Sequence, residues 1–400
     1  MRKSILLLFL LLSSAVGAQR TVVSGMVIDG ATGKPLAGAN VTAGGLSVVT
    51  NGDGFFMLKA DTTVATLTVS HVGYRSGRVG VTAGEQRIRL QPATVRLHEV
   101  LVVAGDAREL VMSAISKIRH NYSQRPELYR CFYRETAMKR QRYITVAEGV
   151  VDMYKTGYQS GTYRDRVAIR KGRRLLSARQ GDTLGIKVQG GPTVPVMMDL
   201  VKNQEQLFTA DELDCYDLTM DIPTAIGDRQ QFVVTMKPRR SLPYALYHGK
   251  LYIDQETLAF TRIELSLDVS DRQKATNVML VKKPLGVRFR PKELSLLIDY
   301  RQGADGLTRM SYLRTTFRFN CDWRRRLFAT SFTAFCEMAV TSSEPSASQP
   351  IRGRDSFDQR DAFFDKVDYF RDPQFWQDYN IIEPTESLDR AVHRLLKRAR

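Results

Sequence analysis

Val22–Leu58 reads VVSGMVIDGATGKPLAGANVTAGGLSVVTNGDGFFML. In this stretch, short segments of alternating apolar and polar residues are separated by Gly, Pro, Asn and Asp, the residues that form turns. The spacing continues downstream and predicts seven short strands, at residues 23–28, 39–43, 46–50, 55–58, 67–71, 78–81 and 88–90. Strands of this length and spacing are typical of a small antiparallel β-sandwich. Asn51–Gly54 is predicted to be a hairpin turn with Asp53 and Gly54 as its central pair, because glycine supplies the positive φ that such turns need.

The first eighteen residues have the three parts of a secretory signal. Arg2 and Lys3 form a basic start, Ile5–Leu12 an apolar core, and Val16-Gly-Ala18 a small-residue exit. The apolar core is far shorter than the roughly twenty residues that a helix needs to cross a bilayer. We therefore expect export with cleavage before Gln19, and a mature protein that lies in the periplasm or is associated with the outer membrane.

Basic residues outnumber acidic ones, with 59 Lys and Arg against 42 Asp and Glu. Without Arg2 and Lys3 the balance is 57 against 42, a formal charge of +15. So large an excess attracts polyanions. Because an exported protein rarely meets nucleic acid, we expect no nucleic acid partner. The expected partners are envelope proteins or anionic envelope components, such as phosphorylated glycolipid, lipid headgroups or acidic polymers.

Downstream of the sandwich the periodicity changes. Asp106 and Glu109 are placed as a capping box, and apolar residues then recur at helical spacing up to Ile118. From Leu128 strands dominate, and sequential hairpins from Gln231 to Val340 predict one large antiparallel sheet. We therefore expect a mainly β protein, in which a seven-stranded antiparallel β-sandwich is followed by an α+β domain with a large antiparallel meander sheet and flanking helices. The expected boundaries are a signal peptide at 1–18, the sandwich at 19–92, a linker and amphipathic helix at 93–126, a β-rich domain with the large sheet at 127–340, a loop at 341–372 and a C-terminal helical segment at 373–400.

One strand of the predicted meander shows its two faces clearly. The basic face carries Tyr312, Arg314, Thr316 and Arg318, which alternate with Leu313, Thr315, Phe317 and Phe319 on the apolar face. An apolar face that the protein's own side chains do not fill can line a ligand cavity. The residues predicted for such a lining are Leu313, Phe317, Phe319, Phe328 and Phe332. The alternative is ordinary core packing against helices near residues 110–118 and 388–396, which leaves no room for a ligand.

The sequence lacks the motifs of common catalytic and metal sites. None of the five histidines has Glu or another His at the three- or four-residue spacing of a helix-borne metal site. There is no Gly-x-Ser-x-Gly elbow and no phosphate-binding glycine loop. We therefore predict no catalytic residue, no metal and no cofactor. The cysteines are widely spaced and form no C-x-x-C pair, so we expect buried free thiols at Cys131, Cys215, Cys321 and Cys336.

Three motifs follow one another in the N-terminal block: Gly25-x-Val27-x-Asp29, Thr32-Gly-x-Pro35-Leu-x-Gly38-Ala39-x-Val41 and Asn51-x-Asp53-Gly54-x-Phe56. Together they resemble the carboxypeptidase regulatory-like domain, a transthyretin-like β-sandwich common on exported proteins of Bacteroidota. The ending from Trp376 to Pro384 resembles a poorly characterised group of exported proteins with the same N-terminal domain. The Gly249–Glu264 hairpin is similar to hairpins in lipoprotein-carrier-like half-barrels, a resemblance that implies a sheet able to hold acyl chains.

Three functions are compatible with these observations. The first is a non-enzymatic cell-envelope protein in which the sandwich is an interaction module and the large β domain is a binding or scaffolding platform. The second is a half-barrel carrier whose curved sheet shelters an apolar ligand such as a lipid. The third is a glycan- or peptide-processing enzyme without a recognisable motif. The absence of catalytic motifs favours the first, because a binding platform needs none.

Overall fold

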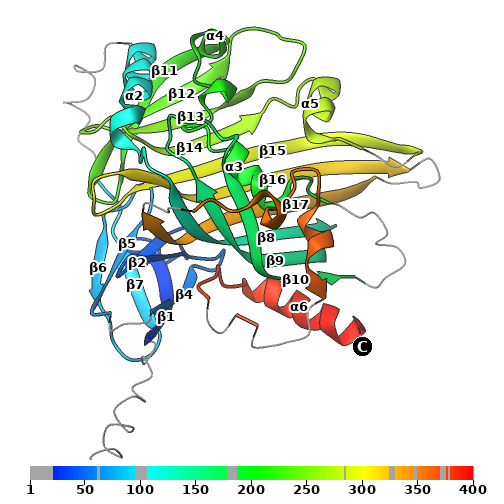
Figure 1. Ribbon diagram of the computed structural model, residues 1–400, viewed down its shortest axis with the longest axis horizontal. Coiled ribbons are helices and arrows are strands. Elements are labelled where there is room, and N and C mark those ends of the chain that lie inside the picture. Colours follow the sequence, from blue (N-terminus) through cyan, green and yellow to red (C-terminus); the bar gives the residue numbers. More distant parts are fainter. Residues whose placement is uncertain are drawn as a thin grey trace, which may run out of the picture.

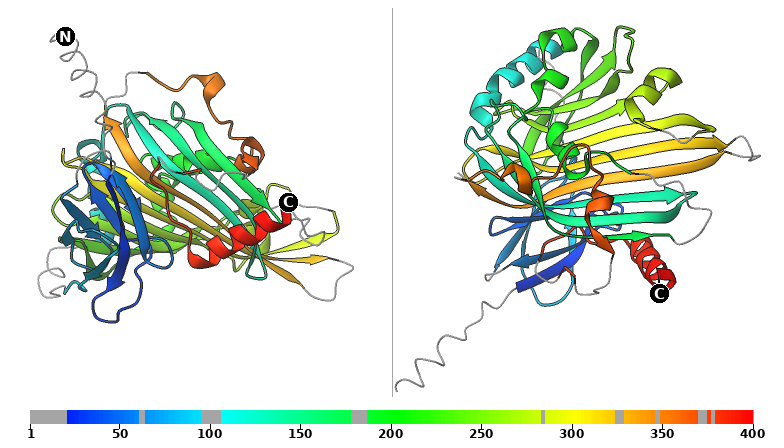
Figure 2. Two further views of the ribbon diagram at one scale, coloured as in Figure 1. Left: turned by 90° about the horizontal axis from the view of Figure 1, so that it is seen from below. Right: turned by 45° about the vertical axis from the view of Figure 1, so that its right-hand side comes forward.

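The computed structural model describes residues 21–60, 64–94, 106–177, 187–282, 285–323, 329–345, 349–369, 375–376 and 379–399. The chain forms a small β-sandwich and a large curved sheet on which helices pack (Figure 1). Figure 2 shows the sandwich against one face of the large sheet, with the C-terminal helix on the same side. The mainly β architecture expected from the sequence is confirmed. Among the described helices, none is both long and apolar enough to cross a membrane.

The sandwich contains the seven strands that the spacing predicted. Its two sheets have the strand orders β4-β1-β7 and β3-β2-β5-β6. The strands are β1 (Thr21–Asp29), β2 (Asn40–Ala43), β3 (Leu46–Val49), β4 (Phe55–Ala60), β5 (Thr66–Ser70), β6 (Gly77–Gly80) and β7 (Gln86–Leu90). Val27, Val41 and Leu58 are fully buried between the two sheets. One pair, β1 with β7, is parallel, whereas the other described pairs of the sandwich are antiparallel as expected.

The turn Asn51–Gly54 differs from the hairpin that was expected. It joins β3 to β4, which belong to different sheets, and the Gly54 N–H donates to the Asn51 carbonyl oxygen at 3.0 Å. Its central pair is therefore Gly52 and Asp53 rather than Asp53 and Gly54. Gly54 does have a positive φ of 76°, and a Cβ atom there would lie 2.7 Å from the Val27 carbonyl oxygen. Glycine alone fits this position without strain.

The large sheet has eleven strands in the order β11-β12-β13-β14-β15-β16-β17-β8-β9-β10-β18. They are β8 (Glu127–Lys139), β9 (Arg142–Lys155), β10 (Arg166–Leu176), β11 (Tyr216–Ile226), β12 (Arg229–Pro238), β13 (Tyr247–Asp254), β14 (Phe260–Leu267), β15 (Val287–Gln302), β16 (Thr308–Trp323), β17 (Thr330–Pro345) and β18 (Asp368–Tyr369). Strands β11 to β17 form the expected meander, and β17 then pairs with β8. β17 continues to Pro345, into the stretch where a loop was expected.

One face of the large sheet, called the inner face here, packs against helix α2 (Ala107–Asn121) and the segment that contains α3 (Val194–Met197) and α4 (Ala210–Leu213) (Figure 1). α2 begins after Asp106, whose carboxylate accepts from the Arg108 N–H at 2.8 Å. A short helix α5 (Arg272–Met279) covers the inner face farther along β14 and β15.

The segments of 3₁₀ helix are Gly191–Thr193, Gln204–Gln206, Gly353–Asp355 and Phe363–Lys366. Residues Cys131, Cys215, Cys321 and Cys336 are buried free thiols, as expected.

The opposite, outer face of the sheet carries the sandwich and the C-terminal helix α6 (Glu386–Ala399) (Figure 2). Leu388 and Leu395 of α6 pack on Val146 and Leu175 of the outer face. The expectation that α2 and α6 close over one shared face is therefore wrong. The two helices lie on opposite faces because outward side chains of β9 and β10 are also apolar, so the amphipathic α6 buries its apolar side there.

Candidate functional site

A row of charged side chains crosses the outer face of the large sheet. In the strand register each member lies directly opposite the next, from Arg173 on β10 to Lys250 on β13. The row consists of Arg173, Glu148, Arg134, Glu337, Arg314, Leu297, Glu264 and Lys250. Opposite charges that face each other across neighbouring strands stabilise a sheet. The alternation of charge in this charged row is interrupted at Leu297.

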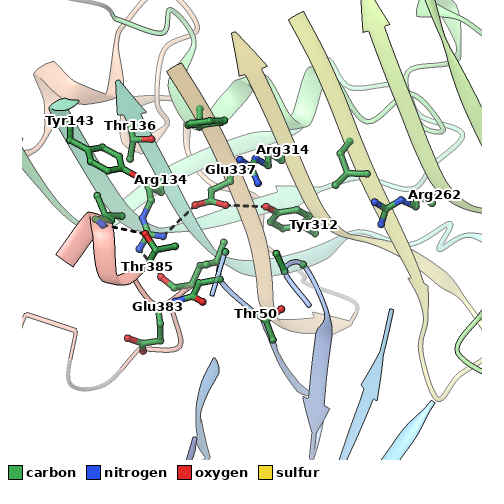
Figure 3. A pocket seen from close by; sticks show the side chains of 18 residues that line it. Thr50, Arg134, Thr136, Tyr143, Arg262, Tyr312, Arg314, Glu337, Glu383 and Thr385 are labelled. Atoms are coloured by element: carbon green, nitrogen blue, oxygen red, sulfur yellow. Dashed lines mark hydrogen bonds and ion pairs between the residues drawn. The ribbon is translucent and has the colours of Figure 1, made fainter. Parts of the chain in front are cut away.

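Arg134 is the buried centre of the charged row (Figure 3). Its Nε donates to Glu148 at 2.8 Å, its Nη1 to Glu337 at 3.3 Å and its Nη2 to the Ile382 carbonyl oxygen at 2.6 Å. The side chains of Arg134 and Glu148 are each only 4% exposed. Burial alone would raise the pKa of Glu148, but Arg134 and Arg173 outweigh it and hold that pKa below its usual value. These buried charges are therefore mutually neutralised.

Arg314 differs, because no described residue forms an ion pair with it. Its neighbours in the register are Glu337 and Leu297. Oε1 of Glu337 already accepts from Arg134, and Oε2 accepts from the Tyr312 hydroxyl at 3.0 Å. Leu297 brings no charge. Arg314 is therefore a surplus cation in an otherwise balanced row.

Two adjoining cavities share Arg314 as a lining residue. The first has a volume of about 180 Å³ and lies between the sheet, the sandwich and the C-terminal segment (Figure 3). The second, of about 450 Å³, lies over strands β13 to β16. Arg262 and Leu297 also line both, and we call the two cavities together the outer groove. The Arg314 guanidinium lies over the Phe335 ring, with Cζ 4.7 Å from the ring centroid.

Arg262, the other arginine shared by the two cavities, is neutralised. Its Nε donates to Glu264 at 2.6 Å, and its Nη1 donates to Asp299 at 3.0 Å. Lys250, at the end of the charged row, pairs with Asp221 at 2.9 Å. Among the arginines and lysines that line the outer groove, Arg314 is therefore the one that forms no ion pair with a described residue.

A row of hydroxyl side chains borders the charged row in the outer groove. Ser266, Ser295 and Thr316 lie opposite one another on β14, β15 and β16, and His248 continues this row on β13. Hydroxyl groups donate hydrogen bonds without adding charge. Ser295 already donates its hydroxyl hydrogen to Glu293 at 3.0 Å. The hydroxyls of Ser266 and Thr316, together with the planar donor fork of Arg314, form a surface suited to a ligand with several anionic oxygens, such as a phosphate or a carboxylate.

The sandwich forms one wall of the outer groove, and the C-terminal segment fixes it there. Thr50 and Asn51 of the sandwich line the smaller cavity. The Asn51 amide donates to the Pro384 carbonyl oxygen at 2.8 Å. The Asn380 side chain pairs with the backbone of Lys59 on the edge strand β4: its Oδ1 accepts from the N–H at 2.7 Å and its Nδ2 donates to the carbonyl oxygen at 3.0 Å. Contacts of this kind hold the wall at a fixed distance from Arg314.

The residues predicted to line an apolar cavity fall into separate parts of the inner face. Leu313 is fully buried in the main core, in the same cluster as residues of α2. Phe317, Phe319 and Phe332 belong to an aromatic cluster near the ends of β15, β16 and β17. The rings of Phe319 and Phe332 stack with centroids 5.5 Å apart. Phe328 lies outside the described residues. A ligand at these positions stays a prediction.

The members of the charged row were not among the predicted site residues. Sequence alternation did mark the face of β16 that carries Arg314 as basic. Nothing in the local sequence shows which acids neutralise which arginines, because Glu337 meets Arg134 only through the pairing of β17 with β8.

The motifs of the N-terminal block are matched by a family comparison. Residues 23–102 match the family described as CarboxypepD_reg-like domain. This segment is a carboxypeptidase regulatory-like domain. The resemblance found in its sequence motifs is thereby confirmed, and the sandwich that walls the outer groove is this regulatory-like domain. No significant match to the chain is found among curated proteins.

Matches to solved structures cover a larger part of the chain. A DUF1329 family protein from Desulfovibrio piger is 8% identical, with 61% of this chain and 95% of that chain covered and a TM-score of 0.27. A domain described as outer membrane lipoprotein-sorting, from Vibrio parahaemolyticus, is 10% identical, with 62% and 97% covered and a TM-score of 0.27. With TM-scores under 0.5, neither similarity establishes a function for this chain.

Proposed function

We propose that this protein is a non-enzymatic, exported envelope protein that binds an anionic envelope component in the outer groove. The large sheet supplies the binding groups, and the regulatory-like domain is the fixed wall that limits the size of the ligand. Export is proposed from the signal features of residues 1–18, which lie outside the described residues. The observation that carries the proposal is the guanidinium of Arg314, which forms no ion pair with any described residue.

An arginine in a partly enclosed groove favours a bound anion for two physical reasons. Partial removal from water weakens its hydration, so an anionic partner gains more there than at a fully exposed site. Its planar fork also forms two parallel N–H···O bonds with one phosphate or carboxylate. Because Arg134 and Arg262 are already satisfied by carboxylates, an incoming anion has Arg314 as its main electrostatic attraction. The formal charge of +15 expected for the mature chain draws anions toward the protein from a distance.

Calorimetric titration of the purified mature protein tests this proposal, with a phosphorylated glycolipid as ligand and inorganic phosphate as a simpler probe. We expect Arg314→Met to weaken glycolipid binding by about tenfold or more, because a hydrogen bond to a charged group contributes roughly 1.5–3 kcal/mol. The matched control is Arg318→Met. Arg318 lies four residues farther along the same face of β16 but pairs with Glu293 at 3.3 Å, so its loss should leave the affinity unchanged.

Two results would overturn the proposal. One is an Arg314→Met variant that binds the glycolipid as tightly as the unchanged protein. The other is an equal loss of affinity in both variants, which would show that general positive charge, and not the outer groove, attracts the ligand. Binding of glycolipid without binding of phosphate would show that the sugar or acyl part adds to recognition while the groove stays the site.

A carrier of an apolar ligand is the second candidate, favoured by the aromatic cluster on the inner face. Phe317 and Phe319 are only partly buried there, although both are large and apolar. Native mass spectrometry of protein purified from its own envelope would show a bound lipid if this candidate holds. Phe317→Glu should then remove the lipid while the regulatory-like domain stays folded. A protein that carries no lipid in either form would exclude a carrier function.

A further inference from the structure

Large apolar side chains are concentrated on the surface at the end of helix α5. Eleven large apolar side chains are exposed among the described residues, and Val278, Val281 and Leu285 lie within eight residues of one another. Val281 is 83% exposed and Leu285 is 103% exposed. Singly exposed apolar residues are ordinary, but a group of this kind marks an interaction surface. These three residues are called the apolar tip here.

The apolar tip is not an unfolded end of the helix, because the other side of α5 is anchored. Ala275 is fully buried, and with Met279 it packs on Leu267 and Leu294 of the sheet. α5 also begins with a cap, since the Asp271 carboxylate accepts from the N–H groups of the first helical turn at 2.9 and 3.1 Å. The fold therefore holds the helix in place and presents the apolar tip outward.

The aromatic cluster of the inner face adjoins the anchored side of α5. Phe317 packs against both the α5 cluster and the aromatic cluster, which makes them continuous. Trp323 and Phe289 belong to this aromatic cluster and are only partly buried. Figure 1 shows α5 and the ends of β15 and β16 on the same side of the molecule. Aromatic side chains with one apolar and one polar end are typical of the boundary between lipid and water.

Exposed cations flank the apolar tip in the sequence and in the sheet. Lys282, Arg288 and Lys292 are exposed and form no ion pair with a described residue. The nearby acids on β15 and β16 already form ion pairs with other residues, because Asp322 pairs with Arg290 and Glu293 pairs with Arg318. The net charge around the apolar tip is therefore positive.

We propose that the apolar tip, with its flanking cations, docks this protein on an anionic lipid surface. The side chains of the tip project from a helix end and the residues after it, so they can enter the boundary between headgroups and acyl chains. The cations are then placed to meet anionic headgroups. This proposal does not depend on the outer groove, which lies on the other face of the sheet.

Vesicle binding by the full mature chain tests the proposal. The fluorescence of Trp323 should shift to the blue when vesicles of mixed phosphatidylcholine and phosphatidylglycerol are added, and Trp376, which is buried in a different cluster, serves as a constant background. We expect the double variant Val281→Asp with Leu285→Asp to lose about tenfold or more in vesicle affinity, because it removes the apolar insertion and adds repulsion. Ile222→Asp is the matched control, since Ile222 is 69% exposed on the distant strand β11.

The outcomes separate this proposal from its alternatives. Binding that is strong on anionic vesicles, weak on pure phosphatidylcholine and lost in the double variant supports it. Absence of binding to anionic vesicles, or equal binding by the double variant, overturns it. Self-association that depends on Val281 without vesicle binding also overturns it, because the apolar tip would then contact a second copy of this chain. The double variant changes no residue that lines the outer groove, so it should bind the glycolipid as the unchanged protein does, and failure of the groove proposal can be told apart from failure of this one.

Discussion

Arg314 on β16 lies directly opposite Glu337 on β17, yet the two side chains form no ion pair, because both oxygens of Glu337 are engaged by Arg134 and Tyr312. The sheet thus places a cation beside an acid that is already neutralised. Leu297, on the other side of Arg314, offers no second acid. Because Leu297 stands where the alternation of charges would place an acid, the Arg314 guanidinium stays available to bind a ligand in the outer groove.

Arg134 and Arg314 should lose very different amounts of stability on the same substitution. Arg134→Met removes one of the two cations that pair with the buried Glu148, and also the cation that pairs with Glu337. It should destabilise the protein by about 3–5 kcal/mol, since Arg173 alone then faces the negative charge of two carboxylates that are largely out of water. Arg314→Met breaks no ion pair and should change stability by only about 0.5 kcal/mol or less. Urea denaturation followed by circular dichroism measures both. A loss of similar size in the two variants would show that Arg314 has a structural partner.

Glu135 should make the protein less stable as the pH rises. It lies on the inner face opposite Cys336 and accepts a hydrogen bond from the Tyr133 hydroxyl at 2.6 Å. Burial raises the pKa of Glu135 to about 8, although the Tyr133 bond acts in the opposite direction. Between pH 4.5, its ordinary pKa, and about 8, the folded protein keeps a proton that the unfolded chain has lost. Its contribution to stability is therefore full below pH 4.5 and is lost as the pH rises to about 8.

The test is the free energy of unfolding across this pH range. The contribution of Glu135 should fall by up to about 1.4 kcal/mol per pH unit, the slope for one proton. Glu135→Gln keeps the side chain neutral at every pH and should remove this slope. A wild-type profile and a variant profile that run parallel from pH 4.5 to 8 would mean that Glu135 ionises normally in the folded protein.

Gly54 should tolerate no side chain. A Cβ atom would lie 2.7 Å from the Val27 carbonyl oxygen and 3.0 Å from the Pro35 Cβ, and φ is positive. We expect Gly54→Val to destabilise the regulatory-like domain by about 1–3 kcal/mol, the usual cost of a strained backbone position. Thermal melting measures this. Gly33→Val is a useful comparison, since Gly33 also has a positive φ but nothing lies within 4 Å of its Cβ position. If Gly54→Val loses more stability than Gly33→Val, the difference is the cost of the close contact at Gly54.

Local patterns predicted the elements of this fold well, because they depend on residues that are neighbours in the chain. The seven sandwich strands, helix α2 and the meander all follow from periodicity and turn residues. The turn at Asn51–Gly54 was predicted with the wrong geometry, since a local turn sequence does not show that its two strands belong to different sheets. The same limit applies to α6. Its sequence shows which side of the helix is apolar, but it does not show which face of the large sheet that side packs against.

The candidate site was only partly predictable, because it is built from contacts between distant segments. Alternation in β16 showed a basic face around Arg314. The neutralisation of Arg134 by Glu337 depends on the pairing of β17 with β8, whose residues are separated by about half of the chain. No sequence pattern records that pairing. Arg314 can therefore be recognised as a cation without a described ion-pair partner only after the structure has shown which acids pair with the neighbouring arginines.

The last prediction concerns how the regulatory-like domain is held against the sheet. β4 is the edge strand of its sheet, and the Asn380 side chain satisfies both backbone groups of Lys59 on that edge. Asn380→Ala leaves this N–H and this carbonyl oxygen without their partner and should cost roughly 1–3 kcal/mol, the penalty for a polar group left unsatisfied on partial burial. Because the lost bonds join two segments of the chain, the edge of β4 should also open more often.

Hydrogen exchange measured along β4 distinguishes this effect from a general loss of stability. In Asn380→Ala, exchange should accelerate at Lys59 and its neighbours while the charged row around Arg134 keeps its protection. Asn277→Ala is the control, since the one side-chain hydrogen bond of Asn277 to a described residue is with Gln273 on the surface of α5. If exchange at Lys59 stayed as slow as in the unchanged protein, the apolar contact of Val49 with Trp376 and Ile382 would be sufficient to hold the domain. We expect the opposite, because that apolar contact covers a different part of the domain and cannot shield the backbone of an edge strand.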